Sequence, residues 1–118
     1  MSKQISKSEL QSLFKNEQAT QKLTLLDVRD PSEFTSTELP PIHLTAKNVP
    51  VATVKSVFEL ENGEFEKSVG IEKPSTDDQI VCYCKLGGRA QKAADALVEL
   101  GFTNVYCYKG SASEWHSN

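Results

Sequence analysis

The sequence has few cysteines and no long apolar run, and each shortage excludes a class of protein. Its 118 residues include three cysteines, Cys82, Cys84 and Cys107, which are too few for a disulfide-built scaffold and cannot all pair with one another. Cys82-Tyr83-Cys84, with only two histidines in the chain, is a poor zinc pattern, so we expect no metal ion. No apolar stretch approaches the roughly 20 residues of a membrane span. We therefore expect a soluble protein with no membrane partner.

The chain also lacks a basic field and a targeting segment. Its net charge is -3 and its pI is near 5.4, with lysines scattered along the sequence, so nucleic acid is not an expected partner. The first twenty residues contain Glu9 and Glu17, no arginine and no apolar run, which fits neither a secretory signal nor a transit peptide. We expect residence in the cytoplasm, with mitochondria as the alternative. No dinucleotide-type glycine pattern is present, so we expect no organic cofactor, and the sequence carries no signal of oligomeric state.

Apolar segments alternate with amphipathic ones along a chain of one domain's length. Ser6-Lys7-Ser8-Glu9 has the form of a capping box and predicts a helix over 7–15. The apolar run 79–84, followed by two glycines, predicts a strand, and the 3.6-residue periodicity that ends at Gly101 predicts a helix over 88–100. The other expected elements are strands at 23–28, near 49 and at 104–108, an irregular connection over 35–50, and helical segments from about 30, at 54–61 with Asn62-Gly63 as its end, near 65 and at 113–115. This alternation predicts an α/β domain built on a parallel sheet.

Cys84 stands at the carboxyl end of the best predicted strand, where open α/β sheets place ligands. Gly87 and Gly88 permit positive φ, so backbone N–H groups can converge above the sulfur at the start of the next helix. Arg89 adds a planar cation suited to an oxyanion. The same field favours thiolate over thiol, which predicts a nucleophile that needs no separate base. The alternative is a strand-Gly-Gly-helix turn in which the cysteine is incidental.

Four segments between residues 23 and 115, in the right order, resemble motifs of rhodanese-like domains. The loop Cys84-x-x-Gly87-x-Arg89-Ala90 resembles the family's active-site loop. The other three are Leu25-Leu26-Asp27-Val28-Arg29 with Glu33-Phe34, similar to "LLDVR…EF"; Ala46-Lys47-Asn48-Val49-Pro50, similar to the end of "GHIPGAxNIP"; and Lys109-Gly110 with Trp115, similar to "GG…W". The resemblance implies that residues 1–118 form a single rhodanese-like domain, with a central parallel sheet and helices on both faces. Residues 41–45 depart from the family's Gly-His-Ile-Pro-Gly, His43 is given no role, and Ser111 replaces a glycine.

The resemblance implies a sulfurtransferase that moves sulfane sulfur from thiosulfate to a thiol such as glutathione, or to cyanide, through a persulfide on Cys84. The implied substrate-binding residues follow it in the loop: Lys85, Leu86, Gly87, Gly88 and Arg89. Phosphatase-like relatives place five residues between cysteine and arginine, whereas four intervene here, which favours sulfur chemistry. Asp27 and Arg29 are expected to support the structure rather than react. The alternative function is a persulfide carrier or regulatory binding module with little turnover on free thiosulfate.

Overall fold

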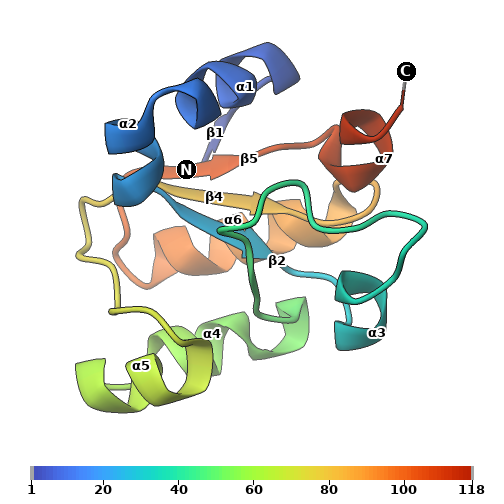
Figure 1. Ribbon diagram of the computed structural model, residues 1–118. Coiled ribbons are helices and arrows are strands. Elements are labelled where there is room, and N and C mark those ends of the chain that lie inside the picture. The colour runs from blue at the N-terminus through green and yellow to red at the C-terminus, as the bar shows by residue number, and fades with distance from the viewer. Residues whose placement is uncertain (1, 118) are drawn as a thin grey trace.

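The computed structural model describes residues 2–117, which form one parallel sheet covered by helices (Figure 1). The order across the sheet is β1-β5-β4-β2-β3, so β4 lies at its centre. The strands are β1 (Lys3–Gln4), β2 (Thr24–Asp27), β3 (Lys47–Asn48), β4 (Ile80–Tyr83) and β5 (Val105–Cys107). The helices are α1 (Lys7–Lys15), α2 (Glu17–Lys22), α3 (Pro31–Phe34), α4 (Val54–Phe58), α5 (Asn62–Val69), α6 (Gly88–Glu99) and α7 (Ser111–Trp115), with a 3₁₀ turn at Val51–Thr53.

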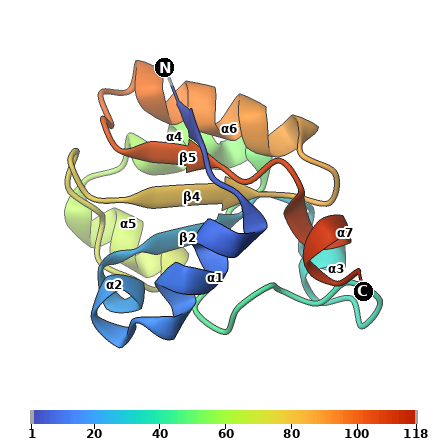
Figure 2. The ribbon, with the colours of Figure 1, turned by 90° about the horizontal axis from the view of Figure 1, so that it is seen from above.

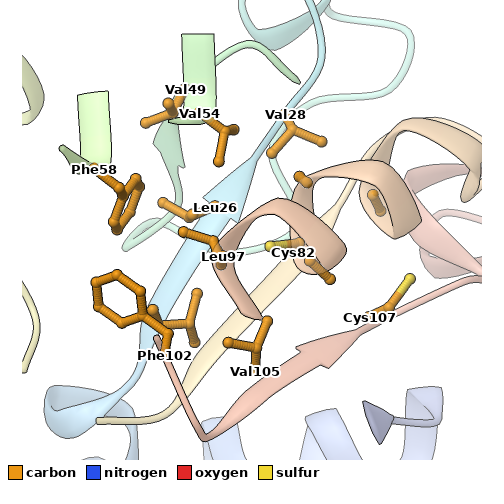
Figure 3. Close-up of a cluster of buried hydrophobic side chains, with 14 of the residues drawn as sticks. Leu26, Val28, Val49, Val54, Phe58, Cys82, Leu97, Phe102, Val105 and Cys107 are labelled. Carbon is orange, nitrogen blue, oxygen red and sulfur yellow. The ribbon is translucent and has the colours of Figure 1, made fainter. Parts of the chain in front are cut away.

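Each face of the sheet has its own apolar core, because successive side chains of a strand point to opposite faces. On one face, Leu26, Cys82 and Val105 pack against α4, α5 and α6 (Figure 3). On the other face, Val81 and Tyr83 pack with side chains of α1 and α7. Figure 2 looks onto this face, with α1 in front of the sheet and α4 and α5 behind it. The predicted fold class, a central parallel sheet with helices on both faces, is confirmed.

The strongest local predictions coincide with observed elements. The capping box is formed, since Ser6 Oγ accepts from the Glu9 amide at 3.1 Å and the Glu9 carboxylate accepts from the Ser6 amide at 2.9 Å. Helix α1 therefore begins at Lys7 as predicted, and α6 occupies all but the last residue of the predicted 88–100 helix. Strand β4 lies inside the predicted run 79–84, and all four of its residues are buried.

Three features differ from the sequence prediction. The prediction that Asn62-Gly63 ends a helix is wrong, because α4 stops at Phe58 and Asn62 begins α5. After α5, the residue in the left-handed conformation is Gly70, with φ of 88°, whereas Gly63 has no such φ. Helix α2 and strand β1 were not predicted; Asn16 caps α2 by accepting from the Ala19 amide at 3.1 Å.

The predicted irregular connection after α3 is confirmed for most of its length. His43 lies in it with its ring stacked on Phe14 at 4.2 Å between centroids, and its Nδ1 lies 2.9 Å from the Thr45 hydroxyl. Trp115 packs edge-on against Phe14 and Tyr108, with centroids 5.5 and 6.1 Å apart. These contacts give His43 and Trp115 a packing role. In residues 2–117, no helix is both long and apolar enough to cross a membrane.

Candidate active site

Cys84 directly follows β4, the central strand, and is 1% exposed. Parallel strands end at the same edge of the sheet, so the loops after β2, β4 and β5 meet there. Figure 1 shows α3 and α7 beyond these carboxyl ends, on the side where α6 begins. The cysteine therefore sits at the meeting point of three connections, as the sequence predicts for a ligand-binding position.

Backbone amides surround the sulfur of Cys84. Its Sγ accepts from the Gly87 amide at 3.0 Å and from the Ala90 amide at 3.4 Å. Ala90 lies in the first turn of α6, so the second contact comes from the positive end of the helix. Two N–H groups aimed at one sulfur favour a negative charge on it, because a charged acceptor makes the stronger hydrogen bonds. The predicted amide nest is present, and Ala90 belongs to it although the sequence prediction did not include it.

Only one of the two loop glycines has a positive φ. Gly87 has φ of 110°, and a Cβ built on it would lie 2.5 Å from the Lys109 carbonyl oxygen. Gly88 is the first residue of α6, has no positive φ, and a Cβ there would meet nothing within 4 Å. The expectation that both glycines curl the loop therefore holds for Gly87 alone.

The Gly87→Ala protein should be markedly less stable than wild type. The new methyl group would be strained at this φ and would collide with backbone, which costs on the order of 1–3 kcal/mol or more. Urea denaturation followed by circular dichroism measures the change. Gly88→Ala is the matched control and should be neutral or slightly stabilising, because alanine favours the helix. Equal losses in both variants would contradict this assignment.

Arg89 forms an ion pair that the sequence prediction did not include. Its Nη1 and Nη2 donate to the two carboxylate oxygens of Glu33 at 2.6 and 3.1 Å, which joins α6 to α3. The hydrogen bonds from Arg89 lower the pKa of Glu33 to about 2, so the pair stays charged well below neutral pH. About a third of each side chain is exposed. Arg89 thus stands next to the loop as a cation that is already partnered, and its role in donor binding stays a prediction.

Asp27 and Arg29 form a buried pair at the end of β2, exposed by 0% and 1%. Arg29 Nε and Nη2 donate to the two Asp27 oxygens at 2.9 and 2.6 Å, and Nη1 donates to the Leu39 carbonyl at 2.8 Å. Burial alone would lower the pKa of Arg29, but the hydrogen bonds and charge of Asp27 outweigh it, so that pKa is raised. The pair ties β2 to the irregular connection. This geometry supports the structural role expected of both residues.

The other two thiols are unsuited to nucleophilic chemistry. Cys82 and Cys107 are 0% exposed and lie in the core beneath α6 (Figure 3). Burial raises the pKa of Cys82 strongly and that of Cys107 to about 11. Both therefore remain protonated thiols at neutral pH. Among residues 2–117, no group of three potential ligands could hold a metal ion.

Two exposed loop residues, Lys85 and Leu86, lie at the surface above the site, next to a small hollow. Lys85 is exposed and Leu86 is 74% exposed. Beside them is a hollow of about 90 Å³, lined by Arg29, Glu33, Ser36, Glu38, Leu39 and Lys85. Its volume is well below the 300–1,000 Å³ of sites that enclose drug-sized ligands. The hollow is too small to enclose a whole tripeptide.

Helix α7 contributes a residue that sequence reasoning did not place in the site. Ser111 was noted only as a substitution for a glycine, yet its Oγ accepts from the Cys84 amide at 3.1 Å and lies 3.9 Å from the Cys84 sulfur. Glu33 was likewise quoted only as part of a motif. Neither residue lies near the loop in the sequence. No local pattern therefore indicated that α3 and α7 fold against the Cys84 loop.

The family model of the rhodanese-like domain matches residues 6–118. The chain belongs to the rhodanese-like domain family. The match includes the loop from Cys84 to Arg89, the Asp27–Arg29 strand end and the turn at Ser111, so the segments that carried the resemblance lie within it.

Curated relatives and solved structures of this rhodanese-like domain extend the comparison. A putative mitochondrial thiosulfate sulfurtransferase of Schizosaccharomyces pombe is 38% identical over 77% of the chain and 61% of its own length. The thiosulfate:glutathione sulfurtransferase of Homo sapiens is 31% identical over 94% of the chain and 90% of its own length. The structure of the human single-domain sulfurtransferase TSTD1 covers 98% of the chain and 96% of its own length, with a TM-score of 0.82 at 30% identity. The chain thus spans nearly all of the human relative but less than two thirds of the S. pombe protein.

Proposed function

We propose that this rhodanese-like domain is a sulfurtransferase that moves sulfane sulfur from thiosulfate to a thiol through a persulfide on Cys84. The observation that carries the proposal is the sulfur of Cys84 held in an amide nest at the carboxyl end of β4. The names of the S. pombe and human relatives support thiosulfate as donor, and the human name supports glutathione as acceptor. We also propose that residues 1–118 work as one domain.

The proposed cycle has two displacements at sulfur. The Cys84 thiolate attacks the outer sulfur of thiosulfate, the S–S bond of the donor breaks, and sulfite leaves with the bonding electron pair. An acceptor thiolate then attacks the outer sulfur of the persulfide, which forms the acceptor persulfide and returns the Cys84 thiolate. The Gly87 and Ala90 amides would stabilise the Cys84 thiolate at the start of the first step and at the end of the second.

Access to the sulfur requires a local movement of the loop, because Cys84 is 1% exposed. The exposed Lys85 and Leu86 form the segment that would shift. The hollow of about 90 Å³ beside Lys85 is lined by Glu33 and Glu38, so the anionic donor, like a larger acceptor such as glutathione, would bind across the open surface of the loop.

The function is tested by the intact mass of the protein after incubation with thiosulfate. We expect the addition of one sulfur atom, mapped by peptide mass to the segment that contains Cys84. Glutathione or cyanide should then remove it. If no donor adds sulfur while the protein remains folded, the proposal is rejected.

The Arg89→Ala protein should bind thiosulfate more weakly. Loss of a charge-assisted contact to the donor costs about 1.5–3 kcal/mol, which raises KM roughly ten- to a hundredfold. Glu33→Gln removes the carboxylate that is ion-paired with Arg89, so the KM of this variant for thiosulfate should fall or stay unchanged. Steady-state kinetics over a range of thiosulfate concentrations measures both. An unchanged KM in Arg89→Ala would mean that Arg89 only ties α6 to α3.

A persulfide carrier that serves a protein partner is the second candidate, favoured by the exposed apolar side chain of Leu86 at the tip of the loop. A carrier would load sulfur but discharge slowly to small thiols, so the rate of discharge to glutathione separates the two functions. For location, we propose the cytoplasm with mitochondria as the alternative, since the S. pombe relative is named mitochondrial. Fractionation of cells that express the protein decides between them.

A further inference from the structure

Helix α7 forms hydrogen bonds with the backbone of Cys84. The Cys84 amide donates to Ser111 Oγ at 3.1 Å, and the Cys84 carbonyl accepts from the Ala112 amide at 2.9 Å. The next carbonyl, that of Lys85, accepts from the Ser113 amide at 3.1 Å. Both backbone polar groups of Cys84, its amide and its carbonyl, are thus hydrogen-bonded to α7. These bonds fix the direction of the Cys84 side chain.

These bonds also orient the amides that follow. In a trans peptide the N–H points opposite to the C=O of the same peptide plane, and the described chain has no cis peptide bond. The carbonyls of Cys84 and Lys85 point to α7, so the N–H groups of Lys85 and Leu86 point away from it. Among residues 2–117 these two N–H groups have no protein acceptor. They are therefore available to a negatively charged group on the open side of the loop.

Ser111 keeps a side chain at a backbone conformation that favours glycine. Its φ is 57°, it is fully buried, and the family motif has glycine at this place. The hydroxyl has one hydrogen and two possible acceptors, the Tyr108 carbonyl at 2.8 Å and the Cys84 sulfur at 3.9 Å. When the Cys84 sulfur is neutral, the Ser111 hydroxyl donates its hydrogen to the Tyr108 carbonyl. A Cys84 thiolate competes for this hydrogen, because hydrogen bonds to charged acceptors are stronger.

We propose that Ser111 is a positioning residue for Cys84, whose hydroxyl holds the Cys84 amide and turns its hydrogen toward the sulfur when the sulfur is charged. The inference rests on the proposed nucleophilic role of Cys84. It adds a side-chain donor from α7 to the two backbone donors from the loop and α6. Ser111 would thereby raise the fraction of thiolate at a given pH.

The ionisable groups around Cys84 allow this effect to be measured. Arg89 on α6 interacts with the charge of Cys84 and stays protonated, since its hydrogen bonds to Glu33 raise its pKa. Burial raises the pKa of Cys82 on β4, and that of Cys107 on β5 to about 11. These two thiols therefore stay protonated near neutral pH. The Cys84→Ser protein supplies the blank.

The test compares wild type with Ser111→Ala, Ser111→Gly and the control Ser68→Ala, which changes an exposed serine on α5. The ultraviolet absorbance of the thiolate is followed against pH, together with the rate of Cys84 alkylation. Loss of the hydroxyl should move the midpoint upward by about one pH unit in both Ser111 variants, the equivalent of one hydrogen bond to a charged group. The control should not move.

Alanine keeps the unfavourable φ and glycine relieves it, so the two variants separate the hydroxyl from the backbone. A shift of less than about 0.2 pH unit in both overturns the inference, as does a shift in only one of them when both fold. If Ser111→Ala fails to fold, Ser111→Gly decides alone. The titration uses no sulfur donor, so an inactive wild type would reject the proposed function without affecting this result.

Discussion

The Cys84→Ser protein is expected to fold as wild type and to take up no sulfur from thiosulfate. Serine is close in size to cysteine, and its oxygen can accept from the Gly87 and Ala90 amides that now bond the sulfur. An alkoxide does not form at neutral pH in this nest, and an oxygen cannot form a persulfide. Turnover should therefore fall to the rate of the solution reaction. Intact mass and a sulfite-release assay measure the loss.

Cys107→Ala is the thiol control for this experiment. Cys107 is buried beneath α6 and its pKa is raised to about 11, so it should not load sulfur at neutral pH. Its removal should leave the mass adduct intact at a modest cost in stability. A sulfur adduct that persists in Cys84→Ser and disappears in Cys107→Ala would place the nucleophile on β5 and reject the proposed mechanism.

Replacing Arg29 with methionine should cause the largest loss of stability among the charged residues discussed. Methionine keeps most of the apolar length but leaves the Asp27 carboxylate buried without its cation and the Leu39 carbonyl without its donor. Removing one partner of a buried ion pair costs about 3–5 kcal/mol. This is a large part of the roughly 5–15 kcal/mol that stabilises a domain. Thermal and urea denaturation measure it.

Two comparisons make the Arg29 result specific. Lys67→Ala breaks an exposed ion pair, in which Lys67 Nζ lies 3.8 Å from Glu64 Oε1. This change should lower the free energy of unfolding by less than about 1 kcal/mol. The double variant Asp27→Leu with Arg29→Met removes both charges and should recover part of the loss. If Arg29→Met proves as mild as Lys67→Ala, the buried pair does not support the fold as described.

The sequence predicted best where a local pattern determines the structure. The capping box at Ser6 and the periodicity before Gly101 depend on neighbours a few residues apart, and α1 and α6 follow them closely. Cys84 and its loop could be proposed as the reactive site because a cysteine at a strand end before Gly87 is a local feature. Residue-by-residue roles in this loop remain predictions for the experiments above.

What the sequence could not predict depends on contacts between distant segments. The Arg89–Glu33 pair joins residues 56 positions apart, and the Ser111 hydroxyl meets the Cys84 amide across 27 positions. No local pattern in the sequence indicates such long-range contacts. The prediction from Asn62-Gly63 was wrong for a related reason. The sequence does not show which glycine adopts the left-handed conformation that commonly ends a helix, and in this segment it is Gly70.

Strand β1 pairs with β5, in the register Lys3 with Tyr106 and Gln4 with Cys107. During synthesis on the ribosome, β1 emerges before the other strands of this sheet, and its partner exists only after residues 105–107 have been made. Contacts between such distant residues also slow folding, since a long loop must close before they form. We expect β2 and β4 to pair earlier, and the sheet edge beside β5 to be covered last. The strand of this sheet that is made first is thus the one that completes it.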